Sequence, residues 1–286
     1  MTSKQKVAIV TDSAAGIPPA LLRQYGIRVV PYLLTWDGVT YLDGVDMTAQ
    51  AFYERFSISP NYPTTAQPTP TSFLEVYRAA LDEAEEVVSI HICERLTSAI
   101  RVARLVAQEV APERIHVVDA LTAAAAQGFV VLGAARAAAD HRSAAEVIAA
   151  AEACTQRVGL LVTMKTLEHL RRGGRLGQAA VLLGSRLNVQ PVLTVMDGQV
   201  RPIGITRSRE QAKERVLAEL RRRSGGAPLR VSVCHANALD EAEEMVQRVQ
   251  KRFPCIELFI SEFTPVMGAH TGPGLIGVGY CLENAS

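Results

Sequence analysis

Short, continuous apolar runs alternate with stretches of helical apolar spacing along the first half of the chain. Uninterrupted runs of about four to eight apolar residues are typical of strands buried on both faces of a parallel sheet. Their alternation with helices predicts an α/β fold. We expect strands at 7–10, 28–34, 86–92 and 115–118, helices at 19–25, 71–84 and 98–109, and two alanine-rich helices between 120 and 153.

The pattern changes near residues 154–160. Strand-like runs follow at 160–163, 191–195, 200–205 and 230–235, and helical stretches at 210–222 and 238–251 would cover them. The pair Asp197-Gly198 between two of these runs is a hairpin turn signal, so this second sheet should be mixed.

A chain of 286 residues is long for one domain, and we predict two. Residues 1–156 should form an N-terminal α/β domain with a doubly wound, Rossmann-like parallel sheet. Residues 157–286 should form a C-terminal two-layer α/β domain with a mixed sheet.

Composition excludes several classes of protein. Apolar residues make up 48% of the chain, charged residues 21%, and the formal net charge is +1, which does not indicate a nucleic-acid binder. Charged residues interrupt the alanine-rich region well before it could span a membrane, so we do not expect an integral membrane protein. The N-terminal residues lack a signal-peptide pattern, which favours a cytoplasmic location.

Cysteines and the common catalytic motifs give no positive signal. The five cysteines are scattered and never form a C-x-x-C pair, so neither a disulfide framework nor a metal site is predicted. His91 and Cys93 share one face of a predicted strand without a clear further metal ligand nearby. The chain contains no G-x-S-x-G or G-x-x-x-x-G-K-[ST] motif.

One imidazole, His270, stands in a glycine-rich segment, 268–274, between two apolar runs. Glycines allow a positive φ and a close approach of backbone N–H groups, and with a histidine they suit a carboxylate or phosphate. A tight turn that leads into a core strand, with His270 bonded to its neighbours, explains the same pattern. The sequence pattern leaves both interpretations open.

Other polar clusters could be sites or helix caps. Asp12 and Ser13 follow the first strand, at the sheet edge where α/β proteins bind ligands, but both residue types also cap helices. Thr64 and Thr65 precede a predicted helix, where an anion could bind. The arginines of 171–175 and 207–209 could bind an acidic group, or in the first case simply end a helix.

Taken in order, these segments resemble the DegV family of bacterial proteins, which includes the fatty-acid-binding subunits of fatty acid kinase. The resemblance spans nearly the whole chain, and order and spacing both agree. It rests on residues 10–13, 63–68, 166–175, 187–193, 197–198, 207–209 and 268–274.

The resemblance implies two α/β domains, the second of the DegV and DAK1 type, with a long-chain fatty acid buried between them. It implies no cofactor and no catalysis by this chain. A threonine, a serine and a histidine would hold the carboxylate, and by position these are Thr64 or Thr65 and His270. A separate ATP-dependent kinase subunit would phosphorylate the bound acid, and Arg175 and Arg207 match arginines that could face it.

The chain departs from the family pattern at the expected serine. Cys93 and Glu94 begin the segment that should carry it, so they become candidate ligand-binding residues. An inward-facing Glu94 would repel a carboxylate, or would accept a hydrogen bond from a neutral carboxyl whose pKa burial has raised.

Two other functions fit the same residues. The first is an enzyme in which His270 acts as general base on a small acidic substrate held by Arg175 or Arg207. The second is a diverged DegV protein that binds a different lipid.

Overall fold

A computed structural model describes residues 5–182 and 189–283 of the chain. It contains a four-stranded sheet, a six-stranded sheet and a small three-stranded sheet. Residues 187 and 188, which belong to one of the segments that resemble the DegV family, lie outside the described part. The predicted α/β fold with a parallel and a mixed sheet is confirmed.

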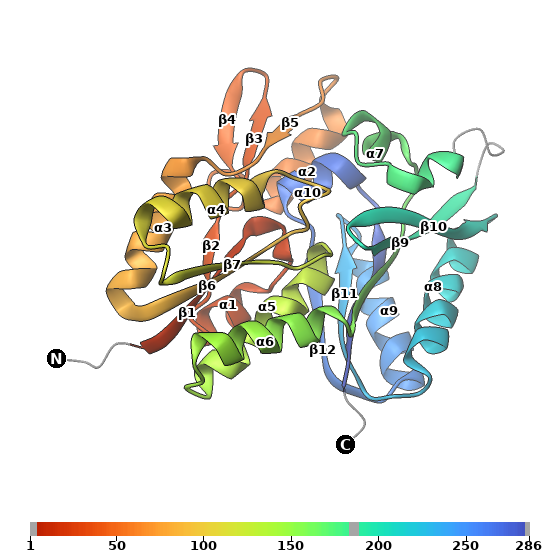
Figure 1. Cartoon of the computed structure of the whole chain (residues 1–286). Helices are drawn as coiled ribbons and strands as arrows, with labels where there is room; N and C mark the ends of the chain where they lie inside the picture. The colour runs from red at the N-terminus through yellow and green to blue at the C-terminus, as the bar shows by residue number, and fades with distance from the viewer. Residues whose placement is uncertain (1–4, 183–188, 284–286) are drawn as a thin grey trace.

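The four-stranded sheet is parallel, with strand order β2-β1-β6-β7. Helices α3 and α4 cover one face, and α5 and α6 lie on the other (Figure 1). The single strand predicted at 28–34 is wrong, because the chain leaves the sheet at Pro31. The elements are β1 (Gln5–Asp12), α1 (Pro19–Gln24), β2 (Arg28–Val30), α3 (Pro70–Glu83), β6 (Ala84–His91), α4 (Ala99–Val110), β7 (Ile115–Asp119), α5 (Ala124–Ala139) and α6 (Ala144–Thr155).

Helix α5 lies between the two large sheets. It packs against β1 on one side and against strands of the six-stranded sheet on the other. Twelve of its residues are buried, and a helix that is apolar all round is stable only when it is covered on every side. The small side chains of its alanines therefore bring the two sheets close together.

The six-stranded sheet is mixed, with order β10-β9-β8-β13-β11-β12. Only β11 and β12 are parallel, and Asp197-Gly198 forms the predicted turn between β9 and β10. Helices α8 and α9 cover the outer face (Figure 1). The elements are β8 (Val158–Thr163), β9 (Gln190–Met196), β10 (Gln199–Thr206), α8 (Arg209–Ser224), β11 (Leu229–His235), α9 (Leu239–Arg252), β12 (Cys255–Glu262) and β13 (Ile276–Leu282).

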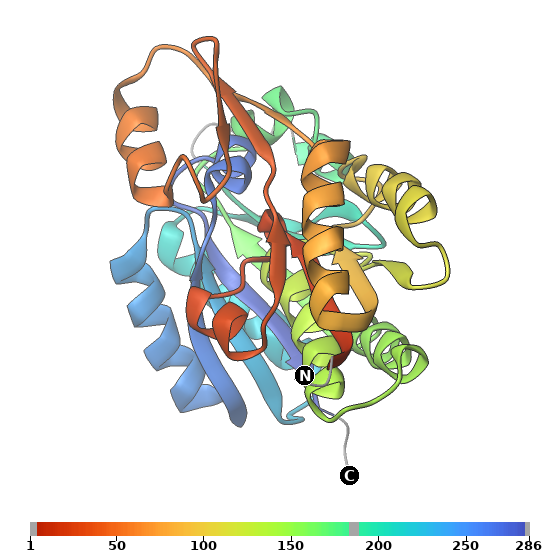
Figure 2. The same ribbon diagram turned by 90° about the vertical axis from the view of Figure 1, so that its left-hand side faces the viewer.

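Several short elements were not predicted. The strands β3, β4 and β5 form the small antiparallel sheet, which lies with α2, α7 and α10 at one end of the molecule (Figures 1 and 2). These strands have three or four residues each, too few for a clear alternation. The elements are β3 (Leu33–Trp36), β4 (Val39–Leu42), α2 (Ala49–Ile58), β5 (Thr64–Ala66), α7 (Glu168–Arg172), α10 (Pro265–Thr271) and the 3-10 helices η1 (Ser13–Ala15) and η2 (Gly177–Leu182).

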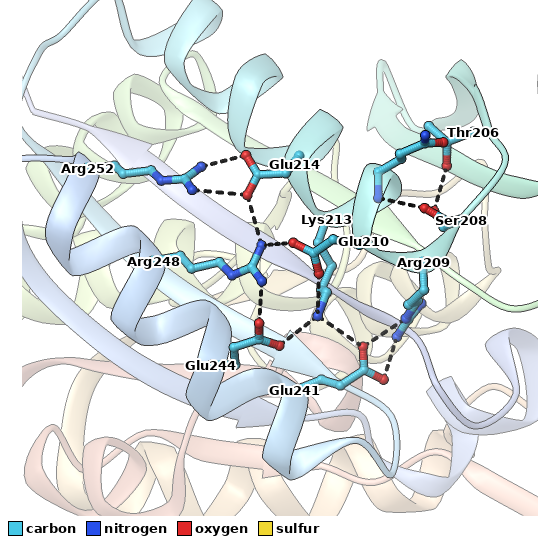
Figure 3. Close-up of polar contacts among 11 residues, drawn as sticks. Thr206, Ser208, Arg209, Glu210, Lys213, Glu214, Glu241, Glu244, Arg248 and Arg252 are labelled. Carbon is cyan, nitrogen blue, oxygen red and sulfur yellow. Dashed lines mark hydrogen bonds and ion pairs between the residues drawn. The ribbon is translucent and has the colours of Figure 1, made fainter.

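Ion pairs join α8 to α9 on the outer face of the second sheet (Figure 3). Lys213 is buried and lies 2.6 Å from a carboxylate oxygen of Glu244. At the edge of this network Arg209 binds Glu241 and also donates to the carbonyl of Gly274, at 2.6 Å. The network therefore fixes the loop that follows α10.

Helix α6 ends at Thr155 and β8 begins at Val158, so the chain passes between the two large sheets where we place the domain boundary. Within residues 5–182 and 189–283, no helix is long and apolar enough to cross a membrane.

Candidate functional site

A cavity of about 130 Å³ lies between the two large sheets. One water-sized group needs roughly 10–15 Å³ on this scale, so the cavity has room for on the order of ten. Its walls are mainly apolar and come from both halves of the chain. They include Ile92 and Ala123 of the first half and Leu160, Val162, Met164 and Leu193 of the second.

The strand pleat determines which residues form this wall. Leu160 and Val162 of β8 line the cavity, whereas Leu161 between them faces the core under α8. On β9, Leu193 lines the cavity and Val192 belongs to that other core. Successive side chains of a strand point to opposite faces, so each strand contributes to the cavity and to a filled core at once.

Polar groups gather around His270. The Nε2 atom of His270 and the Oγ1 atom of Thr65 are 2.8 Å apart. Arg175 also lines the cavity, and its guanidinium donates to the carbonyls of Leu96 and Gly173 at 3.1 and 2.6 Å. Both acceptors are neutral carbonyls, so these hydrogen bonds do not neutralise the positive charge of Arg175.

His270 lies in the last turn of α10, and a tight turn that leads into β13 follows the helix. Thr264 precedes this helix and Pro265 occupies its first turn, where the fixed φ of proline favours a helix start. Glycine conformation matters after the helix instead: Gly272 and Gly274 have φ values of +69° and +84°. They turn the chain directly into β13.

Burial and the nearby charge of Arg175 lower the pKa of His270 to about 4. The imidazole is therefore neutral at pH 7. Within the described residues its buried Nδ1 atom has no hydrogen-bond partner. A neutral imidazole beside a threonine hydroxyl and a guanidinium can bind one carboxylate.

The structure brings Thr65, Arg175 and His270 together and places the other candidates elsewhere. Thr64 is exposed and pairs with Thr35 at the edge of the small sheet. Arg207 is exposed near the start of α8 and does not line the cavity.

Cys93 and Glu94 also lie outside the cavity lining. Cys93 is buried, with its Sγ atom 3.8 Å from the carbonyl oxygen of Gly198, and burial raises the pKa of its thiol to about 12. The Glu94 carboxylate pairs with Arg104 at 3.1 Å and with Arg101 at 3.7 Å.

Two hydroxyls further along the same segment do line the cavity, and the sequence reasoning missed them. Thr97 accepts a hydrogen bond from the Tyr32 hydroxyl at 3.1 Å. Ser98 precedes α4 but makes no side-chain capping bond, so its hydroxyl is available. The presence of two hydroxyl-bearing residues shortly after Glu94 was the feature of the sequence that could have indicated them.

Asp12 and Ser13 are structural. Asp12 is buried and accepts hydrogen bonds from the backbone N–H of Ala14 and of Ile92. Ser13 donates to Asp43, which in turn accepts from the backbone of Val266 at the start of α10. This chain of bonds ties the end of the first strand to the helix that carries His270.

The imidazole of His270 occupies the space that a side chain at residue 173 would need. Gly173 has no side chain, and a Cβ atom there would lie 2.1 Å from the Nδ1 atom of His270. The φ of Gly173 is −74°, which alanine adopts without strain. Any effect of the substitution would therefore come from the clash with the imidazole. We expect Gly173→Ala to displace the ring and to break the bond to Thr65, which ¹H–¹⁵N spectra of the imidazole would report.

Gly204→Ala is the matched control for this substitution, because a Cβ atom at Gly204 meets nothing within 4 Å. It should leave the imidazole signals unchanged. Unchanged signals in Gly173→Ala as well would contradict the assigned contact.

Comparison with known proteins agrees with this architecture. The profile of the DegV family, described as uncharacterised proteins, matches residues 6–283. A DegV domain-containing protein of Streptomyces coelicolor, SCO2569, is 36% identical over 278 residues, which cover 95% of this chain and 97% of that protein.

Two solved structures are also similar over nearly the whole length. One is a DegV family protein from Thermus thermophilus described for its fatty acid binding; it has a TM-score of 0.92 and 34% identity and covers 97% of this chain and 100% of its own. The other is a stearic-acid-binding protein from Eubacterium ventriosum, with a TM-score of 0.87, 25% identity, and 96% and 98% coverage.

Fold and site thus define an α/β protein of two large sheets, with an apolar cavity between them and a histidine in the cavity wall. The chain belongs to the DegV family.

Proposed function

We propose that this protein binds a long-chain fatty acid in the cavity, with the carboxylate against His270, Thr65 and Arg175. The observation that carries the proposal is the position of these three polar side chains in the wall of an otherwise largely apolar cavity. Fatty acid binding by the similar Thermus and Eubacterium proteins supports it.

The acyl chain supplies most of the binding free energy. Burial of about fifteen methylenes at roughly 0.8 kcal/mol each gives about 12 kcal/mol before the costs of ordering are subtracted. Met164 and Met267 line the cavity and can adapt its shape to such a chain, because methionine side chains are unbranched and flexible.

Native mass spectrometry tests the proposal. The protein is stripped of lipid, mixed with stearic acid and compared with the same protein mixed with octanoic acid. We expect one stearic acid per chain and little octanoic acid, because a shorter chain buries fewer methylenes. Absence of a stearic acid complex would overturn the proposal.

The pKa of His270 should rise when the ligand binds. Without ligand it is about 4, because burial and Arg175 disfavour the charged imidazole. A carboxylate within hydrogen-bonding distance favours the charged form and should raise this pKa by one unit or more. Between the two pKa values binding takes up a proton, so affinity for the carboxylate should increase as pH falls through that window.

An NMR titration of the His270 ring, with and without stearic acid, measures both pKa values. His169 serves as an internal reference, because it contacts Gly272 and does not line the cavity. An unchanged pKa for His270 in the complex would show that the carboxylate lies elsewhere.

We further propose that the protein presents the carboxylate to a separate ATP-dependent kinase subunit. A groove beside the cavity supports this idea. It shares Arg175 with the cavity, contains the exposed Arg95, and has three glycines of positive φ in its wall, namely Gly174, Gly177 and Gly198. No carboxylate lines it within the described residues, so it suits an anionic phosphate.

Reconstitution with a purified fatty acid kinase subunit, ATP and stearic acid tests this proposal. We expect acyl phosphate only when both proteins are present, and a loss of at least tenfold in Arg95→Ala, because Arg95 lines the groove. The matched control is Arg215→Ala, an exposed arginine on α8 that does not line the groove. Bound lipid without any phosphorylation would overturn the kinase proposal and leave fatty acid binding intact.

A further inference from the structure

Two cysteines that are far apart in the sequence meet at the junction between the two large sheets. The Sγ atoms of Cys154 and Cys281 are 3.4 Å apart, although 127 positions separate them. Both residues are buried, with exposed fractions of 3% and 4%. All five cysteines are within the described residues, and the contact is specific to these two.

The surrounding backbone holds the two thiols in register. Cys154 lies in the last turn of α6, and Cys281 pairs with Val158 at the start of β8. Arg157 joins both segments, because its guanidinium donates to the carbonyls of Ala153 and Leu282 at 3.2 Å each. The backbone N–H of Leu282 also donates to the carbonyl of Arg157, at 3.0 Å.

Little movement is needed to join the sulfurs. A disulfide bond is about 2.05 Å long, so the Sγ atoms must approach by roughly 1.4 Å. Gly133 lies beside the pair, and a Cβ atom there would be 3.4 Å from the Sγ and Cβ atoms of Cys154. The absence of a side chain at Gly133 leaves Cys154 room to rotate.

The surroundings of Cys281 favour its thiolate form. A hydrogen bond from Cys154 and the nearby charge of Arg157 lower the pKa of Cys281, although burial opposes them. The thiolate is the nucleophile in thiol oxidation. The Cys154 thiol is in contact with the Cys281 sulfur, which is the position that a resolving thiol requires.

We propose that Cys154 and Cys281 form an oxidation site at which a small peroxide produces an intramolecular disulfide. The Cys281 thiolate attacks one oxygen of hydrogen peroxide, the O–O bond breaks, and hydroxide leaves as Cys281 becomes a sulfenic acid. The sulfur of Cys154 then attacks the Cys281 sulfur, the S–OH bond breaks, and water leaves with the proton of Cys154. Two thiols and one peroxide give one disulfide and two waters.

The disulfide would tie α6 to β13 next to the point where the chain crosses between the sheets. It closes a loop that contains β8 to β12 and β13 as far as Cys281. Such a long loop restricts the unfolded chain, so the thermal midpoint should rise by about 5 °C or more. This inference is independent of the proposed lipid ligand.

Thiol counting and peptide mapping test the proposal on the full-length protein. After hydrogen peroxide treatment and denaturation, free thiols should fall from five to three, and the mass should drop by two hydrogens. Digestion without reductant should yield one cross-linked peptide pair that contains Cys154 and Cys281. Dithiothreitol should restore all five thiols and the original midpoint.

Substitutions sharpen the test. Cys281→Ser should abolish the cross-link, and the matched control Cys234→Ser, at an isolated buried cysteine, should retain it. Peptide mapping of the unsubstituted protein decides the question even if a variant fails to fold. Five free thiols after treatment, a sulfinic acid at Cys281, or a cross-link that involves another cysteine would overturn the proposal.

Discussion

Leu193→Trp is expected to lower the affinity for stearic acid by at least a hundredfold without unfolding the protein. Leu193 lies in the wall of the cavity, where an indole can enter empty space. It would then occupy volume that the acyl chain needs, and the loss of about four buried methylenes alone costs about 3 kcal/mol. Isothermal titration calorimetry on lipid-free protein measures the affinity, and circular dichroism measures the thermal midpoint.

Val192→Trp is the matched control, at the next position on β9. Val192 faces the filled core beneath α8, where a larger side chain has no space. Overpacking should reduce the free energy of unfolding by more than the roughly 1–3 kcal/mol that added methylenes cost, and should leave the stearic acid affinity of the folded protein nearly unchanged. Equal effects of the two substitutions on affinity would contradict the assigned cavity wall.

His270→Ala is expected to reduce fatty acid affinity by about tenfold to a hundredfold. A hydrogen bond to a charged group contributes roughly 1.5–3 kcal/mol, and the acyl chain retains its own larger share. The same substitution should have little effect on a fatty alcohol of equal length, because an alcohol has no carboxylate. Calorimetry with the acid and the alcohol measures both effects.

Thr65→Ala should weaken binding of the acid by a smaller factor, because a hydroxyl is a weaker partner than a charged group. Thr64 provides the matched control, since it is the exposed neighbour on the same short strand. If Thr64→Ala weakened binding as much as Thr65→Ala, the bond between Thr65 and His270 would not mark the carboxylate site.

Sequence periodicity predicted the long elements well because they are fully or half buried. The continuous apolar runs of β1 and β6 and the amphipathic spacing of α4 and α9 follow directly from the layers on either side of them. Short elements at the molecular end were missed. Helix α10 has seven residues and depends on Pro265 and on contacts with α2 and α7, which only the fold provides.

The site was predictable only in part for the same reason. His270 and Thr65 are 205 positions apart, and no local pattern indicates that they meet. The resemblance of the motifs to a family suggested the pair, but it could not choose between Thr64 and Thr65. The pleat of β5 distinguishes the two threonines, because it directs Thr65 towards His270 and leaves Thr64 exposed.

The most direct test of the account is a crystal structure of the lipid-free protein soaked with a long-chain fatty acid that carries bromine near the middle of its chain. The account predicts a bromine anomalous peak among Leu160, Met164 and Leu193, and carboxylate density within hydrogen-bonding distance of His270. A bromine peak outside this cavity, or a carboxylate that points away from His270 into solvent, would contradict it.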